Sequence, residues 1–459
     1  MSCANQLNVL SFNCWGLAFV SKHRGYRLKA IAEALSKEDY DIITLQEIWV
    51  YKDFELIQAS VQHVLPYSKY FYSGAFGSGL AILSKFPIIS TAYHRFTLNG
   101  KPLMIFHGDY YVGKGIGSAL INHPTIGLVE VFNTHLHGGY GPKDRYRAHR
   151  ATECWQLAQI LRTSAAMGRQ IILSGDFNSI PTSFNYRLIC DHGFMTDSWL
   201  QIHGEPDPKY FDVNNITADL YTQFFGYTCN SPFNTFSRYY DQGKDTNARK
   251  GFGKRLDYIF YRHTPELQCI DSKVVFTNSI PDSQMSYSDH FGVVSIFKIS
   301  NAHQHKNNQL TGMAPPSFLL CYPNYTHLEP AIIHDILDAL RTNQERAKKD
   351  ANVLLYTLAI CAILHILLYI VVIVLPTTLQ SYGRLPIALV TAFGGLLMNL
   401  TLICVLICLI VGFVFGHTEE RALLQFINEI ETFQKNIEAD RQNNNYFIET
   451  THQNSLKVV

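Results

Sequence analysis

Polar side chains occur where the apolar segments of the first 300 residues end. In chain order they are Asn13, Glu47, His135, Asp176, Asn178, Asp257, Asp289 and His290. Each follows or interrupts a segment that the sequence predicts to be a strand, and strand ends on one rim of a sheet converge in space. These side chains could therefore share one pocket. Their types are those that metal-assisted hydrolysis of a phosphoester requires.

A hard divalent cation binds oxygen ligands, and Mg²⁺ keeps several waters while taking one or two protein carboxylates. We expect Glu47 in the motif LQEIW to be the principal ligand, with Asp289 and Asn13 assisting directly or through water. Mn²⁺ could substitute for Mg²⁺. The cation would polarise a phosphoryl oxygen and stabilise developing negative charge.

The remaining residues fit the proton transfers of the same reaction. His290 is the expected general base for the attacking water, because histidine titrates near neutrality. Asp257 would hold its ring and stabilise the imidazolium, whereas Asp176 and Asn178 would orient the water and the phosphate. His135 would bind a phosphate oxygen or protonate the leaving group. Each short motif alone is also typical of caps and turns, so the prediction depends on the ordered set.

The elements that must position these residues are mostly strands. Apolar patterning predicts strands at 7–13, 41–49, 79–86, 127–137, 170–181, 255–262 and 288–297, and helices at 23–35 and 148–162. Strands with interspersed helices predict an α/β fold in which sheets pack together and helices lie outside. The segment 203–250 is rich in Asn, Tyr and Phe and gives no clear element. Its Phe224, Phe225 and Tyr227 could enter a lipid interface, and burial in a core explains them at least as well.

Two apolar stretches near the C-terminus are long enough to span a bilayer as helices, since a helix rises about 1.5 Å per residue and the hydrocarbon core is about 30 Å thick. The predicted organisation is a soluble domain at 1–300, a linker with a juxtamembrane helix at 301–352, spans at 353–375 and 386–416 joined by a short turn at 376–385, and an amphipathic tail at 417–459. Helical spacing in 327–350 and in the tail predicts either a helix pair or a surface amphipathic helix.

Basic residues are distributed unequally around these spans. Arg346, Lys348 and Lys349 precede the first span, whereas the turn carries only Arg384. The positive-inside rule therefore places the soluble domain and the tail in the cytosol. The basic flank at 341–349 could respond to anionic lipid as an activator, and the spans could support a homodimer.

Composition excludes several other classes. The formal net charge of +1 provides no broad positive field, so no nucleic-acid partner is expected. Ten cysteines stand outside C-x-x-C pairs and zinc-ligand spacings, which indicates free thiols in a reducing compartment. No basic region precedes an apolar run at the N-terminus, so no signal peptide is expected.

The ordered motifs FNCWG, LQEIW, THLH, GDFN, RLDY and SDH resemble the endonuclease/exonuclease/phosphatase superfamily. This resemblance implies a DNase I-like four-layer sandwich of two β-sheets flanked by helices. The stretch 97–117, the motif AHR at 148–150 and the two spans also resemble the smaller, two-span animal neutral sphingomyelinases. In that family an Asp and a Lys five residues apart complete the site, which implies such a role for Asp109 and Lys114. His137 and His149 also match family positions, with a structural role as the alternative.

The resemblance implies phospholipase C-type hydrolysis of sphingomyelin, a lipid of the bilayer, to ceramide and phosphocholine. The membrane would be intracellular, namely endoplasmic reticulum, Golgi or nuclear envelope. Inositol phosphosphingolipids and lyso-platelet-activating factor remain open as substrates. RLDYIF also resembles the AP endonucleases, but a nuclease should carry basic loops. An inositol polyphosphate 5-phosphatase would need a Trp-Cys-Asp-Arg stretch that is absent, and the complete set of candidate residues argues against an inactive membrane scaffold.

Overall fold

The computed structural model describes residues 5–139, 144–207, 218–237, 240, 253–300 and 326–455. Residues 301–325 of the predicted linker segment 301–352, and much of the segment 203–250, lie outside these residues. The chain forms two compact units, of which the first comprises 1–100, 106–333 and 436–459 and the second 101–105 and 334–435.

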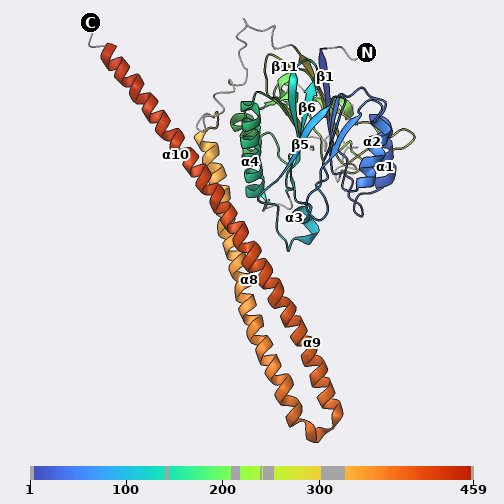
Figure 1. Cartoon of the computed structure of the whole chain (residues 1–459), viewed down its shortest axis with the longest axis vertical. Coiled ribbons are helices and arrows are strands. Elements are labelled where there is room, and N and C mark those ends of the chain that lie inside the picture. Colours follow the sequence, from blue (N-terminus) through green and yellow to red (C-terminus); the bar gives the residue numbers. More distant parts are fainter. Residues whose placement is uncertain are drawn as a thin grey trace. The chain divides into compact units, whose positions relative to one another are not determined.

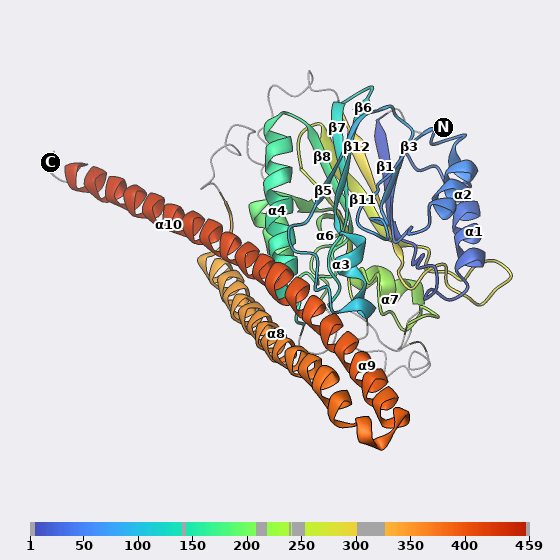
Figure 2. The same cartoon turned by 60° about the horizontal axis from the view of Figure 1, so that its bottom comes forward.

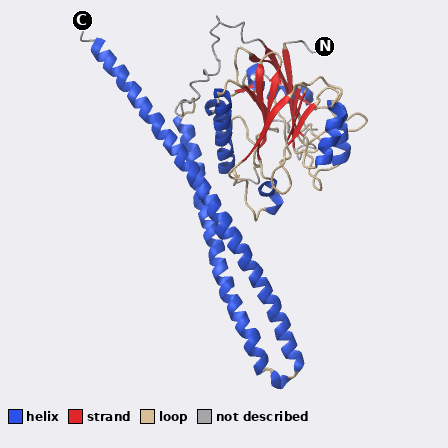
Figure 3. Cartoon of the chain, viewed as in Figure 1, coloured by secondary structure: helices blue, strands red, loops and turns tan. Residues whose placement is uncertain are grey.

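Two six-stranded sheets form the centre of the first unit (Figure 3). The first sheet has the order β11 (Leu267–Val275), β12 (Gly292–Ile299), β1 (Gln6–Asn13), β2 (Ile42–Gln46), β4 (Ala81–Ser84) and β3 (Tyr67–Tyr70). The second has the order β5 (Ile88–Arg95), β6 (Gly115–His123), β7 (Gly127–His135), β8 (Gln170–Asp176), β10 (Asp257–Tyr261) and β9 (Thr196–Asp197). The predicted pair of packed sheets is confirmed.

Strand direction brings the candidate residues to one end of the sandwich. β1 runs parallel to β2, and β7 runs parallel to β8, with His135 opposite Asp176. β10 is antiparallel to β8 and begins at Asp257, which also pairs with Asp176. We call this end, where β1, β2, β7 and β8 finish, the site end.

Helices cover the outer faces of the sheets, as predicted. α1 (Arg24–Leu35) and α2 (Tyr51–Val61) share one apolar cluster with the outward side chains of β1, β2 and β4. α4 (Arg147–Ala166) lies beside the second sheet (Figure 1), and the shorter helices are α3 (Asp109–Val112), α5 (Phe184–Arg187), α6 (Ser198–His203) and α7 (Ala218–Phe225). Leu10 and Phe12 face the helices whereas Val9 faces the other sheet, as strand alternation requires.

The layer between the sheets becomes polar toward the site end. Thr44 is hydrogen-bonded to Ser174 at 2.8 Å, which joins the two sheets. The Gln46 amide donates to Asn133 Oδ1 at 2.8 Å, and Asn133 Nδ2 donates to the carbonyls of Leu45 and Ala81. These buried bonds fix the separation of the sheets where the candidate residues begin, because breaking one would leave a buried polar group unpaired.

The second unit is built from long helices. α8 (Pro330–Thr378) is followed by α9 (Arg384–Cys408), a π-helical stretch (Leu409–Phe415) and α10 (Gly416–Ser455). Figures 1 and 2 both show α8 and α9 side by side. The predicted juxtamembrane helix and the first span are one continuous helix, since nothing in the sequence before residue 353 breaks the helix.

Two stretches of this unit are long and apolar enough to cross a membrane, with mean hydropathies of 3.1 and 2.8. His365 is hydrogen-bonded to Thr401 at 2.9 Å between them. Beyond the apolar stretches, α8 and α10 contact each other, since the Gln344 amide donates to Glu420 at 3.0 Å. Both helices also bury apolar residues there, namely Ile336, Leu337, Leu340, Leu423, Phe426, Ile427 and Ile430. Arg341 adds an ion pair with Glu431 at 2.6 Å.

Candidate functional site

Asn13 connects the two sheets at the site end. Its side-chain nitrogen donates to Glu47 Oε1 and to Asp176 Oδ2, both at 3.1 Å, and both Asn13 and Asp176 are buried. Asn13 Oδ1 accepts from the backbone nitrogen of Trp15 at 3.0 Å. This geometry makes Asn13 a residue that orients two carboxylates, and its predicted contact with a metal stays a prediction.

Glu47 follows β2 in a left-handed conformation with φ of 59°. Its carbonyl accepts from Gly16 at 2.9 Å, so the β1–α1 loop holds this unusual backbone in place. Its Oε2 atom is buried and has no hydrogen-bond partner among the residues that the structure describes. Burial and the carboxylate of Asp289 raise the pKa of Glu47 to about 7. An unpaired oxygen in a field of negative charge is what a cation ligand would show before the cation binds.

His290 and Asp257 form a buried pair. Asp257 Oδ2 lies 2.8 Å from His290 Nδ1, and His290 Nε2 lies 3.9 Å from Asp176 Oδ2. Burial by itself would lower the pKa of His290, but the carboxylates of Asp257 and Asp176 outweigh burial and raise this pKa well above its ordinary value. Because Asp257 binds Nδ1, Nε2 faces Asp176. Nε2 is therefore the nitrogen that would act as the general base.

His135 differs from His290 in charge. Its Nε2 lies 3.5 Å from Asp176 Oδ2, while its buried Nδ1 has no hydrogen-bond partner within the described part of the chain. Burial, Lys114 and His290 lower the pKa of His135 well below its ordinary value. The ring is therefore neutral near pH 7, which suits a hydrogen bond to a phosphate oxygen better than delivery of a proton from a cation.

Asp176 and Asn178 hold each other in the turn after β8. The backbone nitrogen of Asn178 donates to Asp176 Oδ1 at 2.9 Å, and Asn178 itself has a positive φ of 45°. Burial and Asp257 raise the pKa of Asp176 to about 6. The side chain of Asn178 donates to the carbonyl of Leu136 at 3.0 Å.

Lys114 and Asp109 form a buried ion pair at 2.9 Å. The Lys114 ammonium also donates to the Leu136 carbonyl at 2.8 Å, so this carbonyl receives bonds from both Lys114 and Asn178. Asp109 Oδ2 lies 3.6 Å from His137 Nε2. The Lys114 ammonium is thus directed to Asp109.

The carboxylate oxygens at this end fit a divalent metal ion. Ligand atoms of Asp176, Asp257 and His290 all lie within 4.8 Å of one another. Glu47 reaches the same region through Asn13, and Glu47 Oε2 is the unpaired oxygen. Oxygen donors of this kind are those that Mg²⁺ and Mn²⁺ prefer.

Comparison with known proteins identifies the family of the chain. The Endonuclease/Exonuclease/phosphatase family matches residues 10–290. The chain belongs to this family. The predicted resemblance is confirmed, and the family match begins within β1 and ends just before β12.

Three curated relatives show which members of the family are similar. Inositol phosphosphingolipids phospholipase C of Schizosaccharomyces pombe is 42% identical over 64% of this chain and 69% of its own length. A putative neutral sphingomyelinase of Drosophila melanogaster is 32% identical over 64% of this chain and 61% of its own length. Human sphingomyelin phosphodiesterase 2 is 29% identical over 69% of this chain and 70% of its own length. The matched region is thus only part of each of these family members.

The structure adds two residues that sequence reasoning missed. Glu153 Oε2 accepts from the backbone nitrogen of His137 at 3.0 Å, and Arg150 donates to the His137 carbonyl at 3.2 Å. Both residues lie on α4, three positions apart. Glu153 thus binds the backbone N–H of His137 and Arg150 binds its carbonyl, directly after Leu136. In the sequence, the only available sign of these two residues was their spacing of three positions within AHRATE, which places them on the same side of a helix. Burial raises the pKa of Glu153 to about 7.

His137 and His149 lie in the layer behind the site. His137 is buried and stacks on Tyr146 with ring centroids 3.9 Å apart. Burial lowers the pKa of His137 to about 4. His149 is buried on α4, with its ring 5.3 Å from that of Tyr146. The roles of His137 and His149 stay predictions. Their positions are consistent with a structural role in holding the Leu136–Gly138 backbone.

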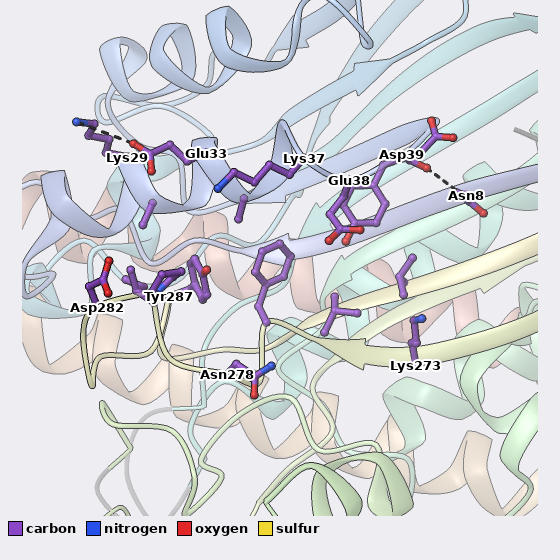
Figure 4. Close-up of a pocket in the computed structure, with 18 of the residues that line it drawn as sticks. Asn8, Lys29, Glu33, Lys37, Glu38, Asp39, Lys273, Asn278, Asp282 and Tyr287 are labelled. Carbon is purple, nitrogen blue, oxygen red and sulfur yellow. Dashed lines mark hydrogen bonds and ion pairs between the residues drawn. The ribbon is translucent and has the colours of Figure 1, made fainter. Parts of the chain in front are cut away.

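A cavity of about 890 Å³ lies elsewhere, between α1 and the outer side of β11 and β12 (Figure 4). Charged residues such as Lys29, Glu33 and Lys273 line it, and no candidate catalytic residue does. It is therefore separate from the site of this family member.

Proposed function

We propose that the protein is a membrane-anchored, Mg²⁺-dependent phosphodiesterase that cleaves sphingomyelin to ceramide and phosphocholine. The observation that carries this proposal is the His290–Asp257 pair at 2.8 Å, whose free nitrogen faces the buried carboxylates. The names of the relatives supply the lipid class, since two of the three are sphingomyelin hydrolases by name.

The residues at the site end can divide the reaction among them. Nε2 of His290 takes a proton from water as the water oxygen attacks phosphorus, and Asp257 stabilises the imidazolium that forms. The bond from phosphorus to the ceramide oxygen breaks, this oxygen takes a proton from solvent water, and the proton held on His290 returns to solvent, so that no net proton is left on the protein. His135 and Asn178 donate hydrogen bonds to the phosphate. When bound by Glu47, Asp289 and Asn13, Mg²⁺ supplies positive charge that stabilises the phosphoryl oxygens and offsets the carboxylate charge around His290.

A second substrate class has an observation in its favour. The relative with 42% identity is named for inositol phosphosphingolipids, and it exceeds the named sphingomyelin hydrolases in identity. The cleaved bond and the ceramide product are of the same kind in both lipids. Only the group on the far side of the phosphate differs, so the two substrates need no change in the residues described above.

The apolar helices support a multi-pass anchor in an intracellular membrane, such as the endoplasmic reticulum, Golgi or nuclear envelope. Because Arg346, Lys348 and Lys349 precede the first span, the catalytic unit faces the cytosol in this proposal. Anionic lipid as an activator and homodimer formation through the spans belong to the same proposal.

The test is release of the phosphorylated head group by the full chain in mixed micelles at neutral pH. Sphingomyelin and an inositol phosphosphingolipid are compared with Mg²⁺, with Mn²⁺ and with a chelator. We expect release that the chelator abolishes, and a loss of at least about 10³-fold in kcat for His290→Ala.

His63→Ala is the matched control, because His63 is exposed on the surface. Release that persists in chelator, or that survives in His290→Ala, would contradict the proposed mechanism. Release from neither lipid by a folded protein would contradict the proposed substrate class.

A further inference from the structure

Three loops at the site end expose large apolar side chains to solvent. They are the β1–α1 loop, the β3–β4 loop and the loop that follows β8. In an ordinary soluble surface such side chains are scattered singly. Here each loop carries at least one, with exposed fractions of 102% for Phe19, 68% for Val20, 69% for Tyr72, 63% for Phe76 and 42% for Ile180.

Sheet register places these loops together around the candidate site. The β1–α1 loop follows Asn13 directly, and the loop after β8 follows Asp176. The β3–β4 loop lies at the same end, because Ala81 at the start of β4 pairs with Leu45 near the end of β2. Figure 1 shows α3 at this end of the sandwich, away from the N-terminal end of β1.

The β3–β4 loop is fixed to the segment that carries Asp109 and Lys114. The backbone nitrogen of Ala75 donates to the Tyr111 carbonyl at 2.7 Å, and Ser73 Oγ donates to the Gly113 carbonyl at 2.7 Å. The ring of Phe76 lies 6.1 Å from that of Tyr111. The loop therefore presents Phe76 from a defined backbone.

The aromatic residues that the sequence suggested for an interface have a different environment. Phe225 stacks on Tyr227 with centroids 5.1 Å apart, and Phe224 contacts Phe225 edge-on at 4.9 Å. Tyr221 in the same group is buried. Phe224, Phe225 and Tyr227 are half-buried and pack on one another, so these three rings expose less apolar surface than Phe19 and Phe76.

We propose that Phe19, Val20, Tyr72 and Phe76 enter the surface of the bilayer that supplies the substrate. This inference rests on the proposed function, because it requires a lipid substrate. The phosphate of a bilayer lipid lies at the level of the head groups, whereas His290 and Asp176 are buried at the ends of the strands. Apolar side chains around the site bring it to that level, since aromatic and aliphatic groups are favoured at the boundary of head groups and acyl chains.

The depth of these side chains in a membrane can be measured without any hydrolysis of substrate, and it tests the proposal directly. The full chain is reconstituted in phosphatidylcholine vesicles that contain lipids brominated in the acyl chains, and tryptophan emission is compared with that of the unsubstituted chain. We expect the added emission of Phe76→Trp to be quenched. Ile89→Trp is the matched control, because Ile89 is 54% exposed on β5, where the adjacent Ile88 pairs with Ile121 far from the site end. Equal quenching of the two variants, or none in Phe76→Trp, would overturn the proposal.

Kinetics supply the second readout. In Phe19→Ser/Phe76→Ser, the rate on sphingomyelin in vesicles should fall about tenfold, as expected when two apolar side chains lose their contact with lipid. The rate on a short-chain sphingomyelin dispersed below its critical micelle concentration should change less than about twofold, and Ile89→Ser should leave both rates unchanged. An equal fall on both substrates would overturn the proposal. If Phe76→Trp were quenched but the chain hydrolysed neither substrate, the proposed contact with the bilayer would stand and the proposed function would be rejected.

Discussion

At the residue scale, the contact between His290 and Asp257 determines which ring nitrogen faces the acidic residues. Asp257 binds Nδ1 at 2.8 Å, so Nε2 is the atom left to accept a proton. The same carboxylate favours the positive ring, as the raised pKa of His290 shows. Orientation and charge stabilisation thus come from one side chain.

The substitution Asp257→Asn tests the orientation of the His290 ring and the stabilisation of its charge without changing the size of the side chain. An amide keeps the size of the side chain but removes its charge and favours the wrong tautomer of the histidine. We expect kcat to fall by about 10²- to 10⁴-fold with a small change in KM. Steady-state kinetics on a dispersed substrate measure this split. Asp282→Asn, at an exposed position on a nearby loop, should behave as the unsubstituted chain; a change confined to KM in Asp257→Asn would contradict the assignment.

Glu153 predicts a pH dependence of stability. Its pKa is raised from 4.5 to about 7, so the folded state favours the protonated carboxyl. The stabilisation of the fold by protonated Glu153 is fully present below the pKa of this group in the unfolded chain. It is lost as the pH rises through the pKa of the folded state. The penalty above neutral pH is on the order of 3 kcal/mol.

Glu153→Gln removes this titration while keeping an acceptor for His137. The melting temperature of the variant relative to the unsubstituted chain should therefore rise between about pH 5 and about pH 8. Thermal unfolding of the full chain in detergent at several pH values checks the result. A difference between the two proteins that is constant with pH would contradict the assigned protonation.

At the scale of elements, the close approach of β7 and β8 sets the position of His135 and Asp176. Gly175 has a positive φ of 146°, and a Cβ atom there would lie 2.0 Å from the Thr134 carbonyl oxygen. The obstacle is backbone in the neighbouring strand, which cannot rotate away. The glycine of GDFN is therefore needed for strand pairing next to the site.

Gly175→Ala should destabilise the fold by about 2–4 kcal/mol and lower activity, because the strands must separate where His135 and Asp176 pair. Denaturant unfolding and head-group release measure the two effects. Gly25→Ala on α1 is the control, since a Cβ atom there meets nothing within 4 Å. If Gly175→Ala matched this control in stability, the close strand contact would not be required.

At the scale of the whole molecule, two apolar stretches separated by a short turn predict that both flanks of the hairpin lie on one side of the membrane. A tag inserted in the turn near Gly383 should be protected from protease in sealed microsomes, and a tag at the C-terminus should be digested. Detergent should expose both tags. Digestion of the turn tag in intact vesicles would reject the cytosolic orientation.

The sequence by itself identified most of the side chains that the structure brings together at the site end, and the two apolar stretches that are long enough to cross a membrane. Strand ends such as GDFN and SDH carry local patterns, and a long uncharged stretch such as 353–375 needs no tertiary context to be seen. It also predicted β1, β2, β7, β8 and β10 in approximately their observed places. These strands are apolar enough for local patterning to identify them.

Only the tertiary structure decided how these residues meet. Asn13 contacts Asp176 across 163 positions, and the pairing follows from sheet register that no local pattern encodes. The exposed or half-buried strands β5 and β11 were missed because their side chains alternate weakly between apolar and polar. The role of Glu153 likewise depends on where α4 packs, and packing is a property of the assembled fold rather than of its segments.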